Sequence, residues 1–212
     1  MKEMENKLTF RRIAIFIAGL LICSMGDSMN FKAAIGVTPY EATQLTGFYI
    51  TGIQVGTLAI ASNCLLMLLQ VIMLRKITPS ILVQIPLCLV QGYIFNFIIN
   101  IFVGNVNLNY PMRVLFLLCG IILAGIGVGL MVFSDVTVFP LESFCKVLSE
   151  RCSIDFAKCR QGADIVFVAG CLLVSFLFHY PFAIREGTIV ATLLFSPIMD
   201  MTIKRLSQNW KQ

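Results

Sequence analysis

The chain has 212 residues, of which 58% are hydrophobic and 13% are charged, and its mean hydropathy is +0.88. A soluble domain carries roughly 25% charged residues, so this share is too small to coat a soluble globule. The composition therefore excludes an ordinary soluble protein. The net charge of +5 comes without the basic groove or interleaved aromatic residues expected of a nucleic-acid-binding protein.

Long apolar segments predict membrane-spanning helices. Residues 53–74, 80–103 and 114–134 contain no charged side chain. Each segment reaches the roughly 20 residues that cross a hydrocarbon core of about 30 Å. Residues 13–35, 163–182 and 187–203 are also apolar but contain ionisable side chains. We therefore expect an all-α membrane protein with six transmembrane helices, forming one domain over residues 1–212 in the lipid bilayer.

The first span has the beginning of a secretory signal, because Lys7, Arg11 and Arg12 precede an apolar segment. The A-x-A pattern of a cleavage site is missing after that segment. We therefore expect an uncleaved transmembrane helix.

The Lys and Arg residues are distributed unevenly between alternate loops. All but three of the 16 precede the first span, follow the second, separate the fourth from the fifth, or end the chain. The exceptions are Lys32, Arg113 and Arg185. Because cytoplasmic loops carry an excess of Lys and Arg, this pattern predicts that both termini are cytoplasmic.

Two short segments repeat at a fixed separation: TPYE at Thr38–Glu41 and FPLE at Phe139–Glu142. The same shift of 101 positions aligns further pairs, namely Gly19 with Gly120, Gly26 with Gly127, and Asn63 with Asp164. Farther along, a register change of about three aligns Asn96 with Asp200. We therefore expect two three-helix repeats, at about 13–103 and 114–204. Each has a short Pro-x-Glu helix between its first and second spans, and the odd number of spans inverts the second repeat.

The segments GVTPYEA, QVGTLAIASNCLLMLLQ and QIPLCLVQGYIFN resemble the YczE/YyaS/YitT family of bacterial membrane proteins. The matching residues are Gly36, Pro39, Tyr40, Glu41, Gly56, Gln84, Pro86 and Gly92 in the first half, and Pro140, Glu142, Gly187, Thr188 and Asp200 in the second. The chain departs from the family pattern at Thr137, Leu141 and Asn96. The resemblance implies a bacterial inner-membrane protein whose family has no defined function.

Pro-x-Glu has a structural explanation, because Thr38, Pro39 and Glu41 can form a capping box that starts a helix. The second segment keeps Pro140 and Glu142 but lacks the capping hydroxyl. In the alternative, each short helix re-enters the membrane and points its N-terminus at the centre, which the composition favours more for the first helix. The second resembles an amphipathic helix on the cytoplasmic surface.

Polar residues inside spans are costly and usually face the bundle interior, so they are candidates for a binding site. The candidate substrate-binding residues are Glu41, Asn63, Asn96, Glu142, Asp164, Asp200 and Asp27. Each acidic residue in a span also has a structural alternative. Asp164 can pair with Arg160, Asp200 can pair with Lys204, and Asp27 can lie near the outer surface with Lys32.

Several motifs are absent or uninformative. Cys-x-x-Cys and Walker motifs are missing, and the single histidine, His179, offers no catalytic partner, so we expect no enzyme, cofactor or metal site. The Gly125–Gly129 and Gly52–Gly56 pairs are expected to form helix-packing faces.

These features favour a transporter-like protein that binds a small molecule or ion between the two repeats. Two alternatives remain open. One is a membrane-embedded binding subunit of a larger transporter, which would co-purify with a motor. The other is a scaffold that docks a protein partner through the basic cytoplasmic segment 146–160.

Overall fold

Helices make up all the regular structure in the computed structural model, which describes residues 10–99, 101 and 108–209. The elements are α2 (Phe10–Ala33), α3 (Pro39–Thr51), α4 (Val55–Leu74), α5 (Pro79–Ile98), α6 (Tyr110–Ser134), α7 (Pro140–Cys152), α8 (Phe156–Phe178) and α9 (Glu186–Asn209). Six of them, all but α3 and α7, are long and apolar enough to cross a membrane. This confirms the six predicted spans and identifies a multi-pass membrane protein. Lys2, Lys7 and Lys211, which contribute to the predicted orientation, lie outside the described residues.

The predicted boundary of the fifth span was wrong by about two helical turns. That span was expected to start at residue 163, but α8 begins at Phe156. The side chain of Asp155 caps the helix by accepting a hydrogen bond of 3.0 Å from the backbone N–H of Ala157. Arg160, which was assigned to the preceding loop, is therefore inside the helix and buried.

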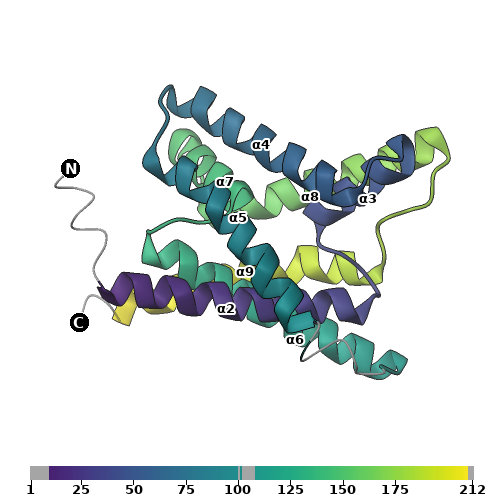
Figure 1. Cartoon of the computed structure of the whole chain (residues 1–212), viewed down its shortest axis with the longest axis horizontal. Helices are drawn as coiled ribbons and strands as arrows, with labels where there is room; N and C mark the ends of the chain where they lie inside the picture. Colours follow the sequence, from purple (N-terminus) through teal and green to yellow (C-terminus); the bar gives the residue numbers. More distant parts are fainter. Residues whose placement is uncertain (1–9, 100, 102–107, 210–212) are drawn as a thin grey trace.

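Helices α2 and α6 form the centre of the molecule and pack more closely than any other pair. Glycines allow their antiparallel backbones to touch. A Cβ atom on Gly26 would lie 2.6 Å from the carbonyl oxygen of Gly120, and one on Gly127 would lie 2.6 Å from that of Gly19. Figure 1 shows α2 and α6 lying along each other, with α2 beginning and α9 ending at the same end of the molecule.

Helix α9 covers another side of α6. Gly125 and Gly129 face Ile198 and Thr202 of α9, which confirms the predicted packing face. The Gly52–Gly56 pair does not form such a face, because Cβ atoms at either position would meet nothing within 4 Å. Instead, Gly52 ends α3 with a φ of 70°, a backbone conformation that glycine adopts at little cost.

The two short helices lie between the long ones. Helices α3 and α7 each pack against both α4 and α8. Figure 1 shows that α3 and α7 occupy opposite halves of the molecule along the direction of α2. Helices α4, α5 and α8 are largely exposed and apolar outside these contacts, as expected for surfaces that meet lipid.

Candidate functional site

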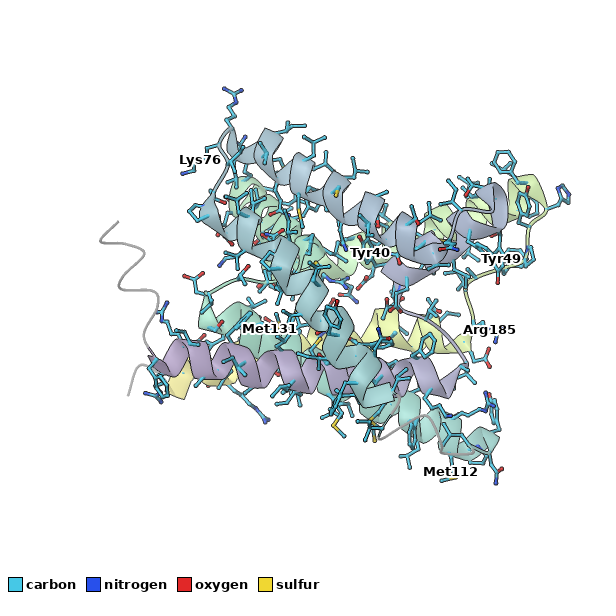
Figure 2. The ribbon with its side chains drawn as sticks, in the orientation of Figure 1. Tyr40, Tyr49, Lys76, Met112, Met131 and Arg185 are labelled. Carbon is cyan, nitrogen blue, oxygen red and sulfur yellow. The ribbon has the colours of Figure 1, made fainter. Side chains whose placement is uncertain are left out.

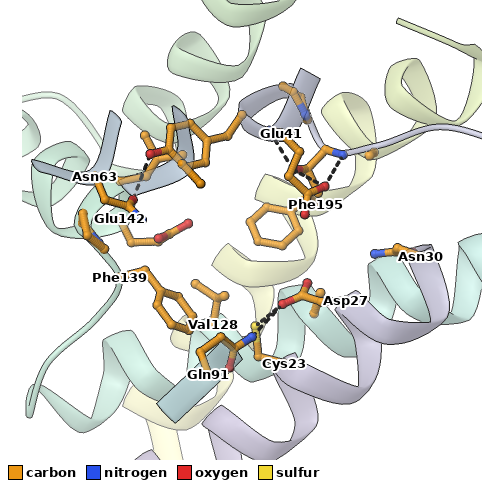
Figure 3. Close-up of a pocket in the computed structure, with 18 of the residues that line it drawn as sticks. Cys23, Asp27, Asn30, Glu41, Asn63, Gln91, Val128, Phe139, Glu142 and Phe195 are labelled. Carbon is orange, nitrogen blue, oxygen red and sulfur yellow. Dashed lines mark hydrogen bonds between the residues drawn. The ribbon is translucent and has the colours of Figure 1, made fainter. Parts of the chain in front are cut away.

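A cavity of about 550 Å³ lies where the N-termini of α3 and α7 meet the middle of the long helices. Cys23 of α2, Ala124 of α6 and Phe195 of α9 line it, and each of these residues is far from both ends of its helix. The charged and amide side chains on the wall are Asp27, Asn30, Glu41, Gln44, Asn63, Gln91, Glu142, Arg160 and Asp164. Figure 3 shows the carboxylates of Asp27, Glu41 and Glu142 arranged around one space.

The wall formed by α3 begins with a complete capping box. Thr38 is the N-cap, and its backbone N–H donates a hydrogen bond of 2.9 Å to Oε2 of Glu41. The Thr38 hydroxyl accepts from the backbone N–H of Glu41 at 3.4 Å. Because Pro39 holds the first helical position, the start of α3 is fixed by three consecutive features of the sequence. The Glu41 carboxylate is held at the cavity wall by the same contacts.

Tyr40 connects α3 to α4 at the cavity. Its hydroxyl lies 2.8 Å from Oδ1 of Asn63 and 2.9 Å from the Ser62 hydroxyl. Burial raises the pKa of the Tyr40 hydroxyl, so it stays protonated and can donate to the Asn63 amide. Asn63 was predicted as a site residue, whereas Tyr40 entered only as a matching family residue.

Asp27 lies on the opposite wall, on α2. Its Oδ2 accepts hydrogen bonds from Nε2 of Gln91 at 3.0 Å and from the thiol of Cys23 at 3.4 Å. The Ser24 hydroxyl lies 2.6 Å from Oε1 of Gln91 and orients that amide. These contacts hold the Asp27 carboxylate at the cavity wall.

Arg160 is the one basic residue on the cavity wall among the described residues. Its Nε lies 3.2 Å from Oε1 of Glu142, and its Nη1 is ion-paired with Asp164 one helical turn later. All three side chains are at most 7% exposed. The guanidinium also lies 5.1 Å from the centre of the Phe195 ring. Burial raises the pKa of Glu142, and the positive charge of Arg160 opposes that shift.

A pair of buried glutamines that do not line the cavity holds the N-terminus of α7. Gln70 of α4 and Gln84 of α5 exchange amide hydrogen bonds of 3.1 and 3.3 Å. Nε2 of Gln70 also donates to the carbonyl of Pro140 at 3.0 Å, and its Oε1 accepts from the Ser143 hydroxyl at 2.8 Å. These amides join α4, α5 and α7, and hydrogen bonds of this kind commonly connect helices inside membranes.

The cavity brings together five of the seven predicted site residues, namely Asp27, Glu41, Asn63, Glu142 and Asp164. The other two do not line it. Asn96 is exposed, and Asp200 forms an ion pair of 2.5 Å with Lys204, the structural alternative for that residue. The predicted site residues did not include Asn30, Gln44, Gln91 and Arg160, which also lie on the wall. The spacing of four residues between Arg160 and Asp164 predicted an ion pair, but only as the structural alternative to a site.

The segment 146–160 is less free for a partner than its composition indicates. Lys146 forms an ion pair of 2.7 Å with Asp135, and Arg160 is buried in the cavity wall. Within the described residues, no group of three or more His, Cys, Asp or Glu side chains could hold a metal ion. The wall of the cavity combines separate polar groups with apolar side chains.

A family model described as a family of unknown function, DUF6198, matches residues 10–204 of the chain. The chain belongs to the DUF6198 family. The match covers five of the long helices completely, α9 as far as residue 204, and every residue that lines the cavity, so the site is a part of the DUF6198 region. The matching family model does not bear the YczE/YyaS/YitT name, and the similarity to that family rests on motifs alone. No curated protein and no solved structure matches the chain.

Proposed function

We propose that this DUF6198 protein is a transporter-like membrane protein that binds a small solute in the central cavity, between two inverted three-helix repeats. The observation that carries the proposal is the position of the cavity. It lies at the middle of the long helices and is lined from both halves of the chain. Secondary transporters built from inverted repeats bind their substrates near the bilayer midplane, at the interface between the repeats.

The helix boundaries support two repeats. Helices α3 and α7 begin and end 101 positions apart, at Pro39 and Pro140 and at Thr51 and Cys152. The residues with left-handed backbone conformations after helices recur in the same way. Ala34 corresponds to Asp135 and Gly52 to Ser153, and the residue after α4, Arg75, corresponds to His179 after α8 with the expected register change. Such conformations are uncommon outside glycine, so their recurrence is a specific signal.

The crossing of α2 and α6 supports the inversion. The sequence repeat pairs Gly19 with Gly120 and Gly26 with Gly127. In space, Gly19 touches Gly127 and Gly26 touches Gly120. This exchange of partners is what a two-fold axis through the crossing produces, because residue i of one repeat then meets residue j of the other and j meets i.

The remaining packing follows the same symmetry in part. Helix α3 packs on α4 and α8, and its counterpart α7 packs on α8 and α4. The symmetry is broken where α9 packs more extensively on α6 than its counterpart α5 packs on α2. Two non-identical halves around one cavity can exchange roles as the inner and outer gates, which alternating access requires.

The distribution of charge supports an orientation in a bacterial cytoplasmic membrane with both termini inside. Arg11, Arg12 and Lys204 lie at the end of the molecule where α2 begins, together with the α4–α5 loop that holds Lys76. Figure 2 shows Lys76 and Arg185 at opposite ends of the molecule, with Tyr40 between them. The positive-inside tendency assigns the more basic end to the cytoplasm.

A ligand screen with a variant that fills the cavity tests the proposal. Gly92 lines the cavity, and a Cβ at this position would meet nothing within 4 Å, so Gly92→Leu can place a side chain in the space without a backbone clash. Gly170 of α8 has equally open surroundings but does not line the cavity, so Gly170→Leu is the matched control. Purified protein in detergent is screened by thermal shift with ions, amino acids, carboxylates and vitamins.

We expect a dose-dependent stabilisation by at least one compound, which is lost in Gly92→Leu and kept in Gly170→Leu. Compounds that stabilise the folded wild type are then tested for uptake into liposomes. A flat screen with well-folded protein, or stabilisation that survives Gly92→Leu, would contradict the proposal.

A further inference from the structure

We propose that the ligand of the central cavity is a small organic cation, an ammonium compound held by the carboxylates of Asp27 and Glu41. This inference rests on the proposed function and adds the chemical class of the solute. It follows from the charges on the wall and from the aromatic side chains between them.

The charge on the wall is negative and unevenly compensated. Four carboxylates face the cavity, belonging to Asp27, Glu41, Glu142 and Asp164, and Arg160 is the one cation on the wall among the described residues. Arg160 is already ion-paired with Glu142 and Asp164. An anionic ligand would have to compete with two buried carboxylates for this guanidinium, which makes the cavity unsuited to anions.

Asp27 and Glu41 have hydrogen bonds but no cationic partner. Asp27 accepts from Gln91 and Cys23, and Glu41 accepts from Thr38. Within the described residues, neither carboxylate forms an ion pair. Asp27 is half-buried, whereas Glu41 is exposed. A carboxylate inside a membrane protein is costly unless a positive charge compensates it, and here a cationic ligand would supply that charge to Asp27.

Asn30 adds polarity to the same wall as Asp27. Its side chain lines the cavity and is 8% exposed. Its Oδ1 atom packs against Gly120 of α6 at the helix crossing, so this oxygen is not the atom that would contact a ligand. Figure 3 shows Asn30 and Asp27 on the same side of the cavity. The acceptor for an ammonium group on this wall is therefore the carboxylate of Asp27.

The walls between the polar groups favour an organic cation over a metal ion. Aromatic rings of Tyr40, Phe95 and Phe139 line the cavity, and ring faces attract ammonium groups. The acidic side chains, in contrast, come from different helices and do not converge as the ligands of one metal ion. Figure 3 shows the rings of Phe139 and Phe195 on the cavity walls beside the carboxylates.

The experiment compares ligands that differ in charge but not in shape. Purified wild-type protein in detergent is titrated with choline, with its uncharged carbon isostere neohexyl alcohol, and with the corresponding anion tert-butylacetate. Propylammonium and tetraethylammonium extend the range of cation size. Binding is measured by calorimetry and thermal shift.

We expect at least one cation to bind, and both isosteres to bind roughly tenfold or more weakly than choline if choline is that cation. Asp27→Asn, and independently Glu41→Gln, should weaken the binding of the cation by a similar factor. Gln at position 41 keeps the capping-box pattern, so this variant should fold even if the first does not. Asp200→Asn removes a carboxylate outside the cavity and should leave the affinity unchanged.

Suppose that the neutral or the anionic isostere binds, that Gly92→Leu abolishes this binding, and that no cation binds. This result would overturn the inference and leave the proposed function standing. Cation binding that Asp27→Asn and Glu41→Gln both leave unchanged would overturn it as well. If no compound of any charge binds to folded protein, both the inference and the proposed function fail.

Discussion

The Nε atom of Arg160 lies 3.2 Å from Oε1 of Glu142, and this contact joins the second turn of α8 to the first turn of α7 inside the protein. Asp164 completes the arrangement from the same face of α8. The carboxylates of Glu142 and Asp164 therefore share one guanidinium, and the N-terminus of α7 is held at the cavity by Arg160. Loss of the Arg160 charge would leave both carboxylates without a cationic partner.

Replacing Arg160 should destabilise the protein strongly. Arg160→Met leaves Glu142 and Asp164 buried without a cation, and breaking a buried ion pair in this way costs roughly 3–5 kcal/mol. Arg160→Lys keeps the charge but loses the planar fork and should have an intermediate effect. The melting temperature in detergent measures both changes. Lys204→Met removes the cation of an exposed pair and should change little; equal losses in Arg160→Met and Lys204→Met would contradict this account.

The crossing of α2 and α6 should not tolerate a methyl group. In Gly26→Ala, the new Cβ would lie 2.4 Å from the backbone nitrogen of Ala124, so the two helices would have to separate. Overpacking of this kind costs roughly 1–3 kcal/mol. Gly170→Ala is the control, because its Cβ would meet open space and alanine favours a helix. A thermal melt in which Gly26→Ala is as stable as Gly170→Ala would show that the crossing is looser than described.

The capping box of α3 should have a measurable effect on stability. Thr38→Ala removes the hydroxyl that accepts from the backbone N–H of Glu41 and should cost about 1 kcal/mol, whereas Thr38→Ser should retain most of the stability. Phe139, at the corresponding position before α7, caps nothing with its side chain, so Phe139→Leu should not affect the start of α7 through capping. Chemical denaturation of the detergent-solubilised variants separates these effects. Equal stability of the Ala and Ser variants would contradict the role of the hydroxyl.

The six spans could be predicted because length and apolar composition alone decide whether a segment can cross a bilayer. The start of α8 could not, because Lys158 and Arg160 are charged and resemble loop residues until the burial of Arg160 between Glu142 and Asp164 is known. The five predicted residues on the cavity wall were found by polarity inside or beside spans. That criterion cannot distinguish Asp164, which turns inward, from Asp200, which pairs with Lys204.

Tertiary packing also decides the role of the amides. Gln70, Gln84 and Gln91 lie on neighbouring spans with similar local sequence. The first two nevertheless pair with each other beside the start of α7, whereas Gln91 holds Asp27 at the cavity. The spacing of glycines likewise does not decide whether they form a packing face. The Gly125–Gly129 pair packs on α9, whereas Gly56 faces the cavity with no atom near its missing side chain.

The proposed orientation predicts where reporter proteins fold. Fusions of green fluorescent protein to either end should fluoresce, because both termini are proposed to be cytoplasmic. Alkaline phosphatase inserted after Arg185, between α8 and α9, should be active because that loop lies at the other end of the molecule. Active phosphatase fused to the C-terminus, with inactive phosphatase at the loop, would reverse the orientation.

The accessibility of two native cysteines tests most directly whether the cavity between the halves admits water and solutes. Cys88 of α5 lines the cavity, whereas Cys119 of α6 does not, and both side chains are partly buried. Each is retained alone in a variant whose other cysteines are replaced, and the protein in liposomes is treated with a positively charged methanethiosulfonate reagent. The account predicts that Cys88 reacts, that Cys119, which lies outside the cavity, does not, and that Gly92→Leu slows the reaction of Cys88. Equal reactivity of the two thiols, or a Cys88 that stays unmodified in folded protein, would contradict a solute-accessible site between the repeats.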